Sequence, residues 1–389
     1  ESVALGRELH TVWDAMAAFP EAASYVALRR GRPVEWPALR SLLAEEGSRP
    51  ESGGQRLVTA HYYCTPGQTL LFVGRADLEQ PEVVRIPLDH GQLSRFVRMH
   101  FGRTRRVREM LEDGHEPEWQ AFSSLVEPLS RWSQRGDVLY LIPHGLLHHL
   151  PLHTLTLEGV PLAERNRVVY SPSASALHVC LNRHRRWEPR GQTRPRAAVF
   201  GDSRGASPAE RLPRSREEAR ALEQQLGVSP LLGEAVTREA FSRAAETAEL
   251  IHFAGHGDLA AEDGLESGLR LAAGDVLRAR EVFSLRMNPD LVTLSGCETG
   301  VSEFRSGDEL LGLPAAFLYA GAESLLASQW RVDDASTAFL MREFYARAFG
   351  TPALPKAEAL RQAMQVTRQQ PEWGDFYHWG AFTLVGDWK

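Results

Sequence analysis

The stretch Leu291-Val-Thr-Leu-Ser-Gly-Cys-Glu-Thr-Gly300 joins four apolar or β-branched residues to a cysteine that is set among small residues. Residues 291–294 have the composition of a buried strand, and the small residues after them are typical of a turn. The pattern predicts that Cys297 stands at the end of a strand. A second stretch has the same design, because Glu249-Leu-Ile-His-Phe-Ala-Gly-His-Gly257 predicts an apolar strand that ends just before His256.

If these two strands are parallel neighbours, His256 and Cys297 meet at the carboxyl edge of the sheet, where open α/β sheets bind ligands. An adjacent imidazole lowers the pKa of a thiol or takes its proton, and the thiolate is the nucleophile. Glycines on both sides of His256 leave the Gly257 N–H accessible, so the Gly257 and Cys297 amides can form an oxyanion hole. The residues alone leave open a second interpretation, in which Cys297 is a small buried apolar side chain and His256 a loop histidine.

Composition narrows the function classes. The chain has 389 residues, 43% of them hydrophobic and 24% charged, which is typical of a soluble globular protein with room for two domains. The net charge of −6 and the lack of a basic stripe argue against nucleic acid and anionic membranes as partners. Cys64, Cys180 and Cys297 are widely spaced, so we expect no disulfide framework and a reducing, cytoplasmic location.

The ends and the apolar runs of the chain give two further expectations. No apolar run approaches the roughly 18 to 20 residues that cross a bilayer, and the N-terminus lacks the apolar region of a signal peptide. The chain begins at Glu1 rather than at a methionine, which leaves open that it is a fragment.

The order of the predicted elements favours an α/β fold with a mostly parallel sheet. Apolar or β-branched segments predict strands at 55–63, 69–74, 83–87, 138–142, 197–200, 229–232, 249–254, 291–294, 324–329 and 381–385. Helical patterns occur at 91–111, 118–133, 215–226, 237–248, 307–320 and 356–369, and a further helix begins at Asp334. Strands separated by helix-length segments indicate right-handed crossovers between parallel strands.

The composition also predicts how the chain is divided into structural units. Residues 1–54 read as a helical segment, and the polar stretch 183–196, rich in arginine and proline, is typical of a domain boundary. The stretch from 146 to about 195 reads as a connecting region. The predicted units are an N-terminal helical segment (1–54), a first half with its connecting region (55–190) and a second half with both candidate catalytic residues (191–389).

Several motifs in this order resemble those of the CHAT domain, a family of bacterial caspase-like cysteine peptidases akin to separase. The motifs are Ile251-His-Phe-Ala-Gly-His-Gly257, the stretch 291–300, Leu325-Leu-Ala-Ser-Gln-Trp-Arg-Val-Asp-Asp334, His378-Trp-Gly-Ala-Phe382, the segment 138–155, and Tyr170-Ser-Pro-Ser-Ala174. The resemblance covers nearly all of the chain beyond about residue 55. It implies a caspase-like sandwich of a mostly parallel sheet flanked by helices, with a non-catalytic, pseudo-caspase-like half before about residue 190.

The resemblance also implies an activity. His256 and Cys297 would form the catalytic dyad of an endopeptidase that cleaves a protein substrate without metal or cofactor. Related proteins are often regulated effectors in bacterial defence that carry tetratricopeptide repeats or a sensor domain, so we expect an activating protein or an upstream sensor domain as a partner. The sequence itself contains no such repeat. The alternative is a non-enzymatic CHAT-fold module that serves in binding or scaffolding.

The separase-like pattern suggests specificity for arginine before the scissile bond. In that pattern an acidic residue after the tryptophan-containing strand receives the arginine, and Asp334 or Asp333 matches this place. Asp333 or Asp334 would also make a good N-cap for the helix that follows, so the pocket role and the cap role are both open, and one residue could serve in both. Glu298 is a rival acid, as are Asp308 and Glu309. The segment from Ser328 to Trp330 could pair with the substrate backbone by strand addition.

Four histidines raise the question of a metal site. His144, His148, His149 and His153 include two pairs with a spacing of four residues, but prolines and a glycine interrupt any helix that would align them. We therefore predict no metal there. His252 is four residues before His256 and is predicted to be buried packing.

Overall fold

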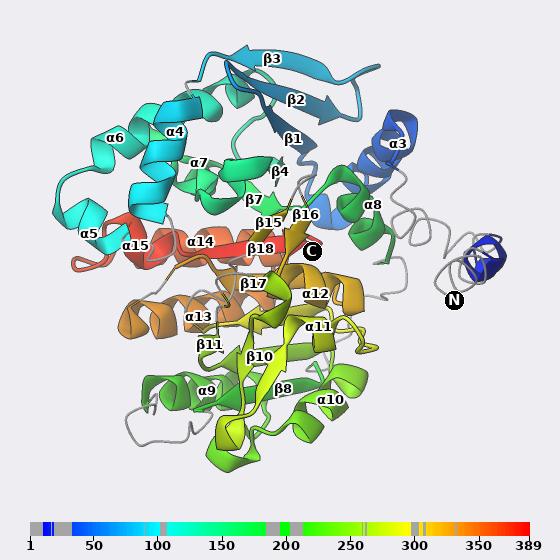
Figure 1. Ribbon diagram of the computed structural model, residues 1–389, viewed down its shortest axis with the longest axis vertical. Helices are drawn as coiled ribbons and strands as arrows, with labels where there is room; N and C mark the ends of the chain where they lie inside the picture. Colours follow the sequence, from blue (N-terminus) through cyan, green and yellow to red (C-terminus); the bar gives the residue numbers. More distant parts are fainter. Residues whose placement is uncertain are drawn as a thin grey trace.

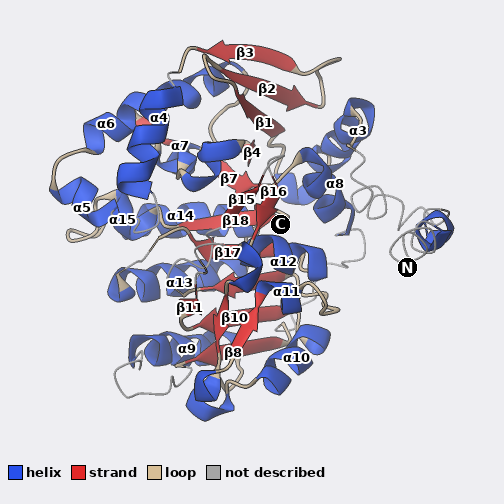
Figure 2. Ribbon diagram, in the orientation of Figure 1, coloured by secondary structure: helices blue, strands red, loops and turns tan. Residues whose placement is uncertain are grey.

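A computed structural model describes residues 11–16, 18, 33–88, 90–101, 107–183, 195–202, 213–258, 260, 263–296, 303–305, 309–330 and 333–389. Its described residues form an 11-stranded sheet with helices on both faces (Figures 1 and 2). Most neighbouring strands in this sheet are parallel. The predicted fold class, an α/β structure built on a mostly parallel sheet, is confirmed.

The strand order of the large sheet is β3-β2-β1-β4-β7-β18-β17-β14-β10-β8-β9. The strands are β1 (Leu57–Cys64), β2 (Thr69–Arg75), β3 (Glu82–Ile86), β4 (Val138–Ile142), β7 (Arg167–Tyr170), β8 (Ala197–Gly201), β9 (Leu231–Leu232), β10 (Leu250–Ala254), β14 (Leu291–Leu294), β17 (Ser324–Ser328) and β18 (Phe382–Gly386). Antiparallel pairing joins β1 to β2, β2 to β3, and β17 to β18.

Among the described residues, short strands form three further sheets outside the large sheet. They are β5 (Thr156–Leu157) with β6 (Val160–Pro161), β11 (Gly257–Asp258) with β12 (Gly268–Arg270) and β13 (Val276–Arg278), and β15 (Glu303–Arg305) with β16 (Glu309–Leu311). The three-stranded sheet β11-β12-β13 begins directly after His256.

The helices cover both faces of the large sheet. They are α3 (Trp36–Gly47), α4 (His90–Phe96), α5 (Val107–Glu112), α6 (Glu116–Gln120), α7 (Leu162–Arg165), α8 (Ala174–Arg183), α9 (Pro213–Leu226), α10 (Arg238–Thr247), α11 (Ala279–Val282), α12 (Leu313–Ala320), α13 (Asp334–Ala348), α14 (Lys356–Arg368) and α15 (Phe376–Trp379). A five-residue π-helical segment, Val97–Phe101, continues α4. In Figure 1, α9, α13 and α14 cover one face, and α10 and α12 cover the other.

The central strands are buried on both faces. Every residue of β4, β10, β14, β17 and β18 is buried, as expected for strands covered by helices on each side. The edge strand β3 is mostly exposed. Because both faces of the central strands are buried, their sequences are continuous apolar runs, and such runs can be recognised as strands from the sequence.

β7 and β18 join the two halves of the chain into one sheet. They pair in parallel with Val385 opposite Tyr170, and β18 also pairs with β17. The expected connecting region 146–195 contains elements that the sequence did not predict, namely the strands β5, β6 and β7 and the helices α7 and α8. The β7 segment Arg-Val-Val-Tyr is only four residues long, and its pairing partners are distant in sequence. The predicted division at about residue 190 stays a prediction.

The predicted helix 307–320 is only partly correct. The helix begins at Leu313, and Glu309–Leu311 instead pairs as a strand with Glu303–Arg305. Gly312 separates the two elements with a φ of 154°, a conformation that favours glycine. Leucines at 310 and 311 fit a helical apolar pattern equally well, so periodicity alone did not separate the two.

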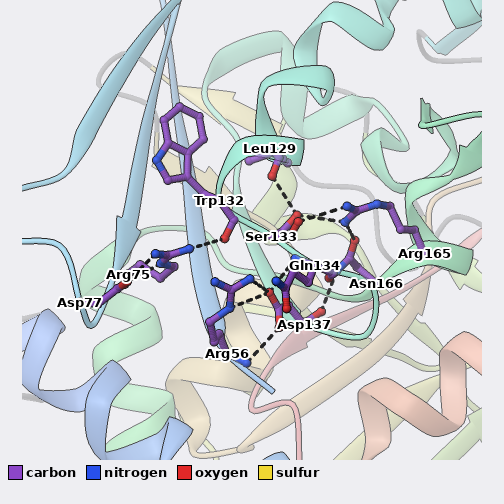
Figure 3. Close-up of polar contacts among 10 residues, drawn as sticks. All are labelled: Arg56, Arg75, Asp77, Leu129, Trp132, Ser133, Gln134, Asp137, Arg165 and Asn166. Carbon is purple, nitrogen blue, oxygen red and sulfur yellow. Dashed lines mark hydrogen bonds and ion pairs between the residues drawn. The ribbon is translucent and has the colours of Figure 1, made fainter. Parts of the chain in front are cut away.

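A polar network fixes the amino edge of the first half. Asp137, just before β4, accepts hydrogen bonds from the Arg56 backbone N–H at 3.1 Å and the Arg56 guanidinium at 2.9 Å (Figure 3). Asn166 Nδ2 donates to Asp137 O at 3.1 Å, and the buried Arg165 donates to Ser133. These bonds tie together the chain just before β1, β4 and β7, so the network is structural.

Candidate active site

The strands that lead to His256 and Cys297 are parallel neighbours, as the sequence predicts. β10 pairs with β14 so that Phe253 lies opposite Leu294, and Ser295 N–H donates to Phe253 O at 2.9 Å. His256 is the third residue after Phe253, and Cys297 is the third residue after Leu294. The two strands therefore end at the same edge of the sheet.

Part of the predicted site lies outside the described residues. Cys297 and Glu298 belong to this part, as does Asp308. The catalytic role of Cys297, its amide in the oxyanion hole and the pocket role of Glu298 stay predictions.

His256 is half-buried and directly precedes β11, the first strand of the small antiparallel sheet. Its carbonyl accepts a hydrogen bond from Arg270 N–H at 3.0 Å, and Arg270 forms an ion pair with Asp258 at 3.1 Å. These contacts tie the backbone of His256 to β12. The position of the imidazole at the carboxyl edge of the sheet thus rests on two sheets, β10 in the large one and β11 in the small one.

The Gly257 N–H points away from the strand that pairs with β11. Gly257 lies opposite Leu269 in the β11–β12 pair, next to the hydrogen-bonded pair of His256 and Arg270. Hydrogen-bonded and non-hydrogen-bonded pairs alternate along an antiparallel ladder, so the pair of Gly257 and Leu269 is of the second kind. The ladder therefore does not use the Gly257 N–H, and the oxyanion role of this amide stays a prediction.

Ser328 holds the residue that precedes Cys297. The Ser328 hydroxyl donates to Gly296 O at 2.6 Å, and both residues are buried. Ser328 is the last residue of β17, the neighbour of β14. The end of one strand thus fixes the start of the turn that carries the candidate nucleophile, a contact that the sequence did not reveal.

A buried network of polar side chains joins β10 and β14 to the helices α9 and α13. His252 Nδ1 lies 3.0 Å from the Tyr345 hydroxyl, which donates to Thr293 Oγ1 at 2.7 Å, while His252 Nε2 lies 3.1 Å from Glu218 Oε1. Burial raises the pKa of Tyr345, so its hydroxyl keeps its proton. His252 is buried, as predicted. Its partners on α9 and α13 were missed, because their sequence separation gives no local signal.

Asp333 caps the helix after the tryptophan-containing strand. Its Oδ1 accepts hydrogen bonds from Ala335 N–H at 3.0 Å and Ser336 N–H at 2.9 Å. The capping alternative is confirmed for Asp333. Asp334 is exposed in the first turn of α13. Nothing described tests whether either carboxylate receives a substrate side chain.

The Trp330 side chain belongs to the core. It is fully buried, and its Nε1–H donates to Tyr377 O at 3.2 Å. Gln329 N–H donates to Ala381 O at 2.8 Å, so one edge of this segment already pairs with the chain before β18. The indole therefore has no surface for a substrate, and strand addition at 328–330 stays a prediction for the other edge.

A cavity of about 50 Å³ lies near the end of β17. It is lined by Pro143, His148, Tyr170, Ser171, Pro172, Pro314, Ala327, Gln329, Thr383 and Val385. None of these lining residues is acidic, so the cavity as described has no carboxylate for an arginine side chain.

His153 uses both ring nitrogens in hydrogen bonds. Nε2 lies 2.8 Å from Gly380 O, a pure acceptor, so Nε2 carries the proton and Nδ1 accepts from the Tyr170 hydroxyl at 2.9 Å. Burial lowers the pKa of His153 to about 4, although the bond to Gly380 opposes this shift. His144 Nδ1 accepts from Cys64 N–H at 3.2 Å. His153 and His144 thus use ring nitrogens in hydrogen bonds with other parts of the first half and with Gly380.

Among the residues that the structure describes, no helix is long and apolar enough to cross a membrane.

Comparisons with known proteins agree with this geometry. A family model for the CHAT domain matches residues 117–387, more than half of the chain. Tetratricopeptide repeat protein 28 from Homo sapiens is 26% identical over 293 residues, and the protein of that name from Mus musculus is 26% identical over 299. The matches cover 64% and 65% of this chain but only 11% and 12% of those relatives.

Solved structures show the same fold. Two structures of the Saccharomyces cerevisiae separase–securin complex are similar to 90% of this chain, with TM-scores of 0.58 and 0.60 and sequence identities of 11% and 12%. The chain spans 30% and 31% of those chains. The predicted caspase-like architecture is confirmed, and the chain belongs to the CHAT domain family.

Proposed function

We propose that this chain is a cysteine endopeptidase in which His256 is the general base and Cys297 the nucleophile. The observation that carries the proposal is the pairing of β10 with β14, since each candidate residue follows the last paired residue of its strand by three positions. Membership of the CHAT domain family and a separase-like fold support a peptidase.

The proposed reaction uses few groups. His256 takes the proton of the Cys297 thiol, and the thiolate attacks the carbonyl carbon of the scissile peptide bond. The Gly257 and Cys297 amides donate hydrogen bonds to the oxyanion that forms. The C–N bond then breaks as His256 returns its proton to the leaving amine, and water hydrolyses the thioester to release the acid and the thiol.

For the substrate we propose a protein cleaved after arginine. Asp333 uses one carboxylate oxygen for its cap, which leaves exposed Asp334 as the favoured acid of the pair, with Glu298 as a rival. A carboxylate can bind a guanidinium through two hydrogen bonds. Asp334→Asn should therefore raise KM for arginyl substrates more than for substrates with an uncharged residue at that position.

We further propose that the activity is regulated, in a bacterial defence or signalling system, by an activating protein or a sensor domain. The CHAT domain resemblance supports this setting. The matched relatives are named for tetratricopeptide repeats, and this chain spans a small share of their length.

The test compares wild type with Cys297→Ala and His256→Ala. We expect wild type to cleave fluorogenic arginyl peptides and to be labelled on Cys297 by an arginyl chloromethyl ketone. Both variants should lose cleavage, and His256→Ala should react with the ketone far more slowly. Equal turnover by wild type and Cys297→Ala contradicts the proposal.

One observation favours a second candidate, a non-enzymatic binding or scaffolding module. The curated relatives carry the name of a repeat protein, which describes an architecture rather than a reaction. In that case wild type and Cys297→Ala should bind a partner protein equally well, and the ketone should label Cys297 of wild type no faster than it labels a free thiol.

A further inference from the structure

Three potential metal ligands lie together in the first half of the chain. One ligand atom from each of His100, His115 and Glu118 lies within 4.8 Å of the others. His100 is in the π-helical segment after α4, His115 directly precedes α6, and Glu118 is on α6. Figure 1 shows α4, α5 and α6 grouped on one side of the first half.

The His100 side chain is buried, and one of its ring nitrogens makes no hydrogen bond to any described residue. It is only 5% exposed, and its buried Nε2 has no hydrogen-bond partner among the residues that the structure describes. Burying such a group without a partner costs about 1 to 3 kcal/mol, so this atom is poorly placed for a purely structural histidine. The imidazole of His115 lies beside it, with ring centroids 5.2 Å apart.

The other two ligands already have a spacing that suits a metal ion. His115 Nδ1 lies 3.1 Å from Glu118 Oε1. In a tetrahedral zinc site with bonds of about 2.0 to 2.1 Å, neighbouring ligand atoms lie about 3.3 Å apart. The ligand atom of His100 lies within 4.8 Å of both of these atoms.

We propose that His100, His115 and Glu118 form a binding site for a divalent transition-metal ion of the zinc type. Two imidazole nitrogens and one carboxylate oxygen match zinc chemistry, whereas Mg²⁺ and Ca²⁺ prefer sites made of oxygen ligands. Three protein ligands leave a fourth position for water. The site differs from the histidine stretch 144–153 that the sequence singled out, because its ligands are scattered at positions 100, 115 and 118.

The ion would fasten α4 and α6 to the core. Phe101, next to His100, packs against Trp119 with ring centroids 5.5 Å apart and against Trp330 at 6.5 Å. Trp330 follows β17, the strand whose end holds Gly296. A bound metal ion would therefore stabilise the packing of Phe101 against Trp119 and Trp330, close to the end of the strand that holds Gly296. The binding site itself does not depend on the proposed peptidase function.

The test is zinc binding to the full chain after treatment with a chelator. All proteins carry Cys297→Ala, so that the candidate catalytic thiol cannot bind the ion. Calorimetry should show one Zn²⁺ per chain. Cobalt in place of zinc should give the visible d–d bands of a four-coordinate site without a thiolate charge-transfer band.

Ligand variants and a matched control complete the test. Glu118→Gln should weaken zinc binding by at least about 10-fold and His115→Ala by at least about 100-fold, while Glu116→Gln, an identical charge change on the same helix, should bind like its parent. Glu118 and Glu116 are exposed, so both variants should keep the parent's circular dichroism spectrum. Failure of the parent to bind zinc, or equal affinity in Glu118→Gln and Glu116→Gln, overturns the proposal.

Discussion

Tyr345 donates a hydrogen bond from its hydroxyl to Thr293 Oγ1 at 2.7 Å. The same hydroxyl lies 3.0 Å from His252 Nδ1, and His252 lies opposite Thr293 in the β10–β14 pair. One side chain of α13 thus connects, at a single register position, the two strands that lead to His256 and Cys297. These two contacts of the Tyr345 hydroxyl help to hold the ends of β10 and β14 at a fixed distance from each other.

Tyr345→Phe should lower both stability and activity. The change removes the hydroxyl and leaves buried partners on β10 and β14, which should cost about 1 to 3 kcal/mol in the free energy of unfolding. The proposed kcat should fall while KM changes little, because the substrate does not touch Tyr345. Urea unfolding and peptidase kinetics measure the two effects.

Tyr62→Phe is the matched control. Tyr62 is also fully buried, and its hydroxyl donates to Leu125 O at 3.0 Å, but it lies on β1 in the first half. It should lose comparable stability and keep kcat. Equal losses of kcat in both variants would mean that stability alone explains the effect.

Ser328→Ala should slow the proposed reaction. The variant loses the 2.6 Å hydrogen bond to Gly296 O and loosens the backbone directly before Cys297. A neutral hydrogen bond is worth about 0.5 to 1.5 kcal/mol, so kcat should fall by up to about 10-fold. Steady-state kinetics with an arginyl peptide measures the change.

Ser324→Ala serves as the control at the other end of β17. The Ser324 hydroxyl donates to Asp387 O at 2.9 Å and is equally buried. This variant should lose similar stability without a change in kcat. If Ser324→Ala slows the reaction as much as Ser328→Ala does, Ser328 has no special positioning role.

His153 should make the protein less stable in weak acid. Burial lowers the pKa of His153 to about 4 in the folded state, against about 6.5 in an unfolded chain. Between these values the unfolded state binds one proton more, so the free energy of unfolding falls as the pH drops from about 6.5 to 4, by up to about 3 kcal/mol. Above pH 6.5 the contribution is complete.

Denaturant unfolding between pH 4 and 8 measures this effect in wild type and in His153→Gln. Glutamine can still donate to Gly380 O but does not titrate. We expect the variant to have a shallower slope of stability against pH in this window. An unchanged slope would assign the acid sensitivity to other groups.

Glu358 should contribute stability that is lost at a lower pH. Burial raises the pKa of Glu358, but hydrogen bonds from Arg361, Gln362 and Arg167 and the charge of Arg361 outweigh burial and lower the pKa to about 2. Its stabilising effect is therefore present above about pH 4.5 and disappears as the pH falls toward 2. Glu358→Gln should reduce the free energy of unfolding at pH 7 by up to about 3 kcal/mol.

The difference between wild type and Glu358→Gln, measured from pH 7 down to 2, should shrink toward zero. Glu343→Gln is the control, because its 2.7 Å ion pair with Arg347 is more exposed and should contribute less than about 1 kcal/mol. A constant difference across the pH range would show that the charge of Glu358 is not the cause.

Several elements were predictable because their signals are local. The four-residue apolar run of β14 and the run before His256 gave two buried strands. The helix predicted at 237–248 is confirmed as α10, which Thr237 caps by accepting a hydrogen bond from Ala240 N–H at 3.2 Å. Strand β7 was missed, because its burial comes from β4 and β18, which are distant in sequence.

The site divides in the same way. The sequence alone singled out His256 and Cys297 and placed each at a strand end, since a run of apolar residues followed by small ones is a local pattern. The sequence offered Asp333 as a helix cap or a pocket acid, and the structure shows the cap. Only the tertiary structure shows that Trp330 is in the core, that Tyr345 contacts β10 and β14, and that Ser328 holds Gly296. Contacts between residues far apart in the chain leave no periodic trace in it, because they depend on how helices pack across the sheet. The scattered ligands His100, His115 and Glu118 belong to this second class.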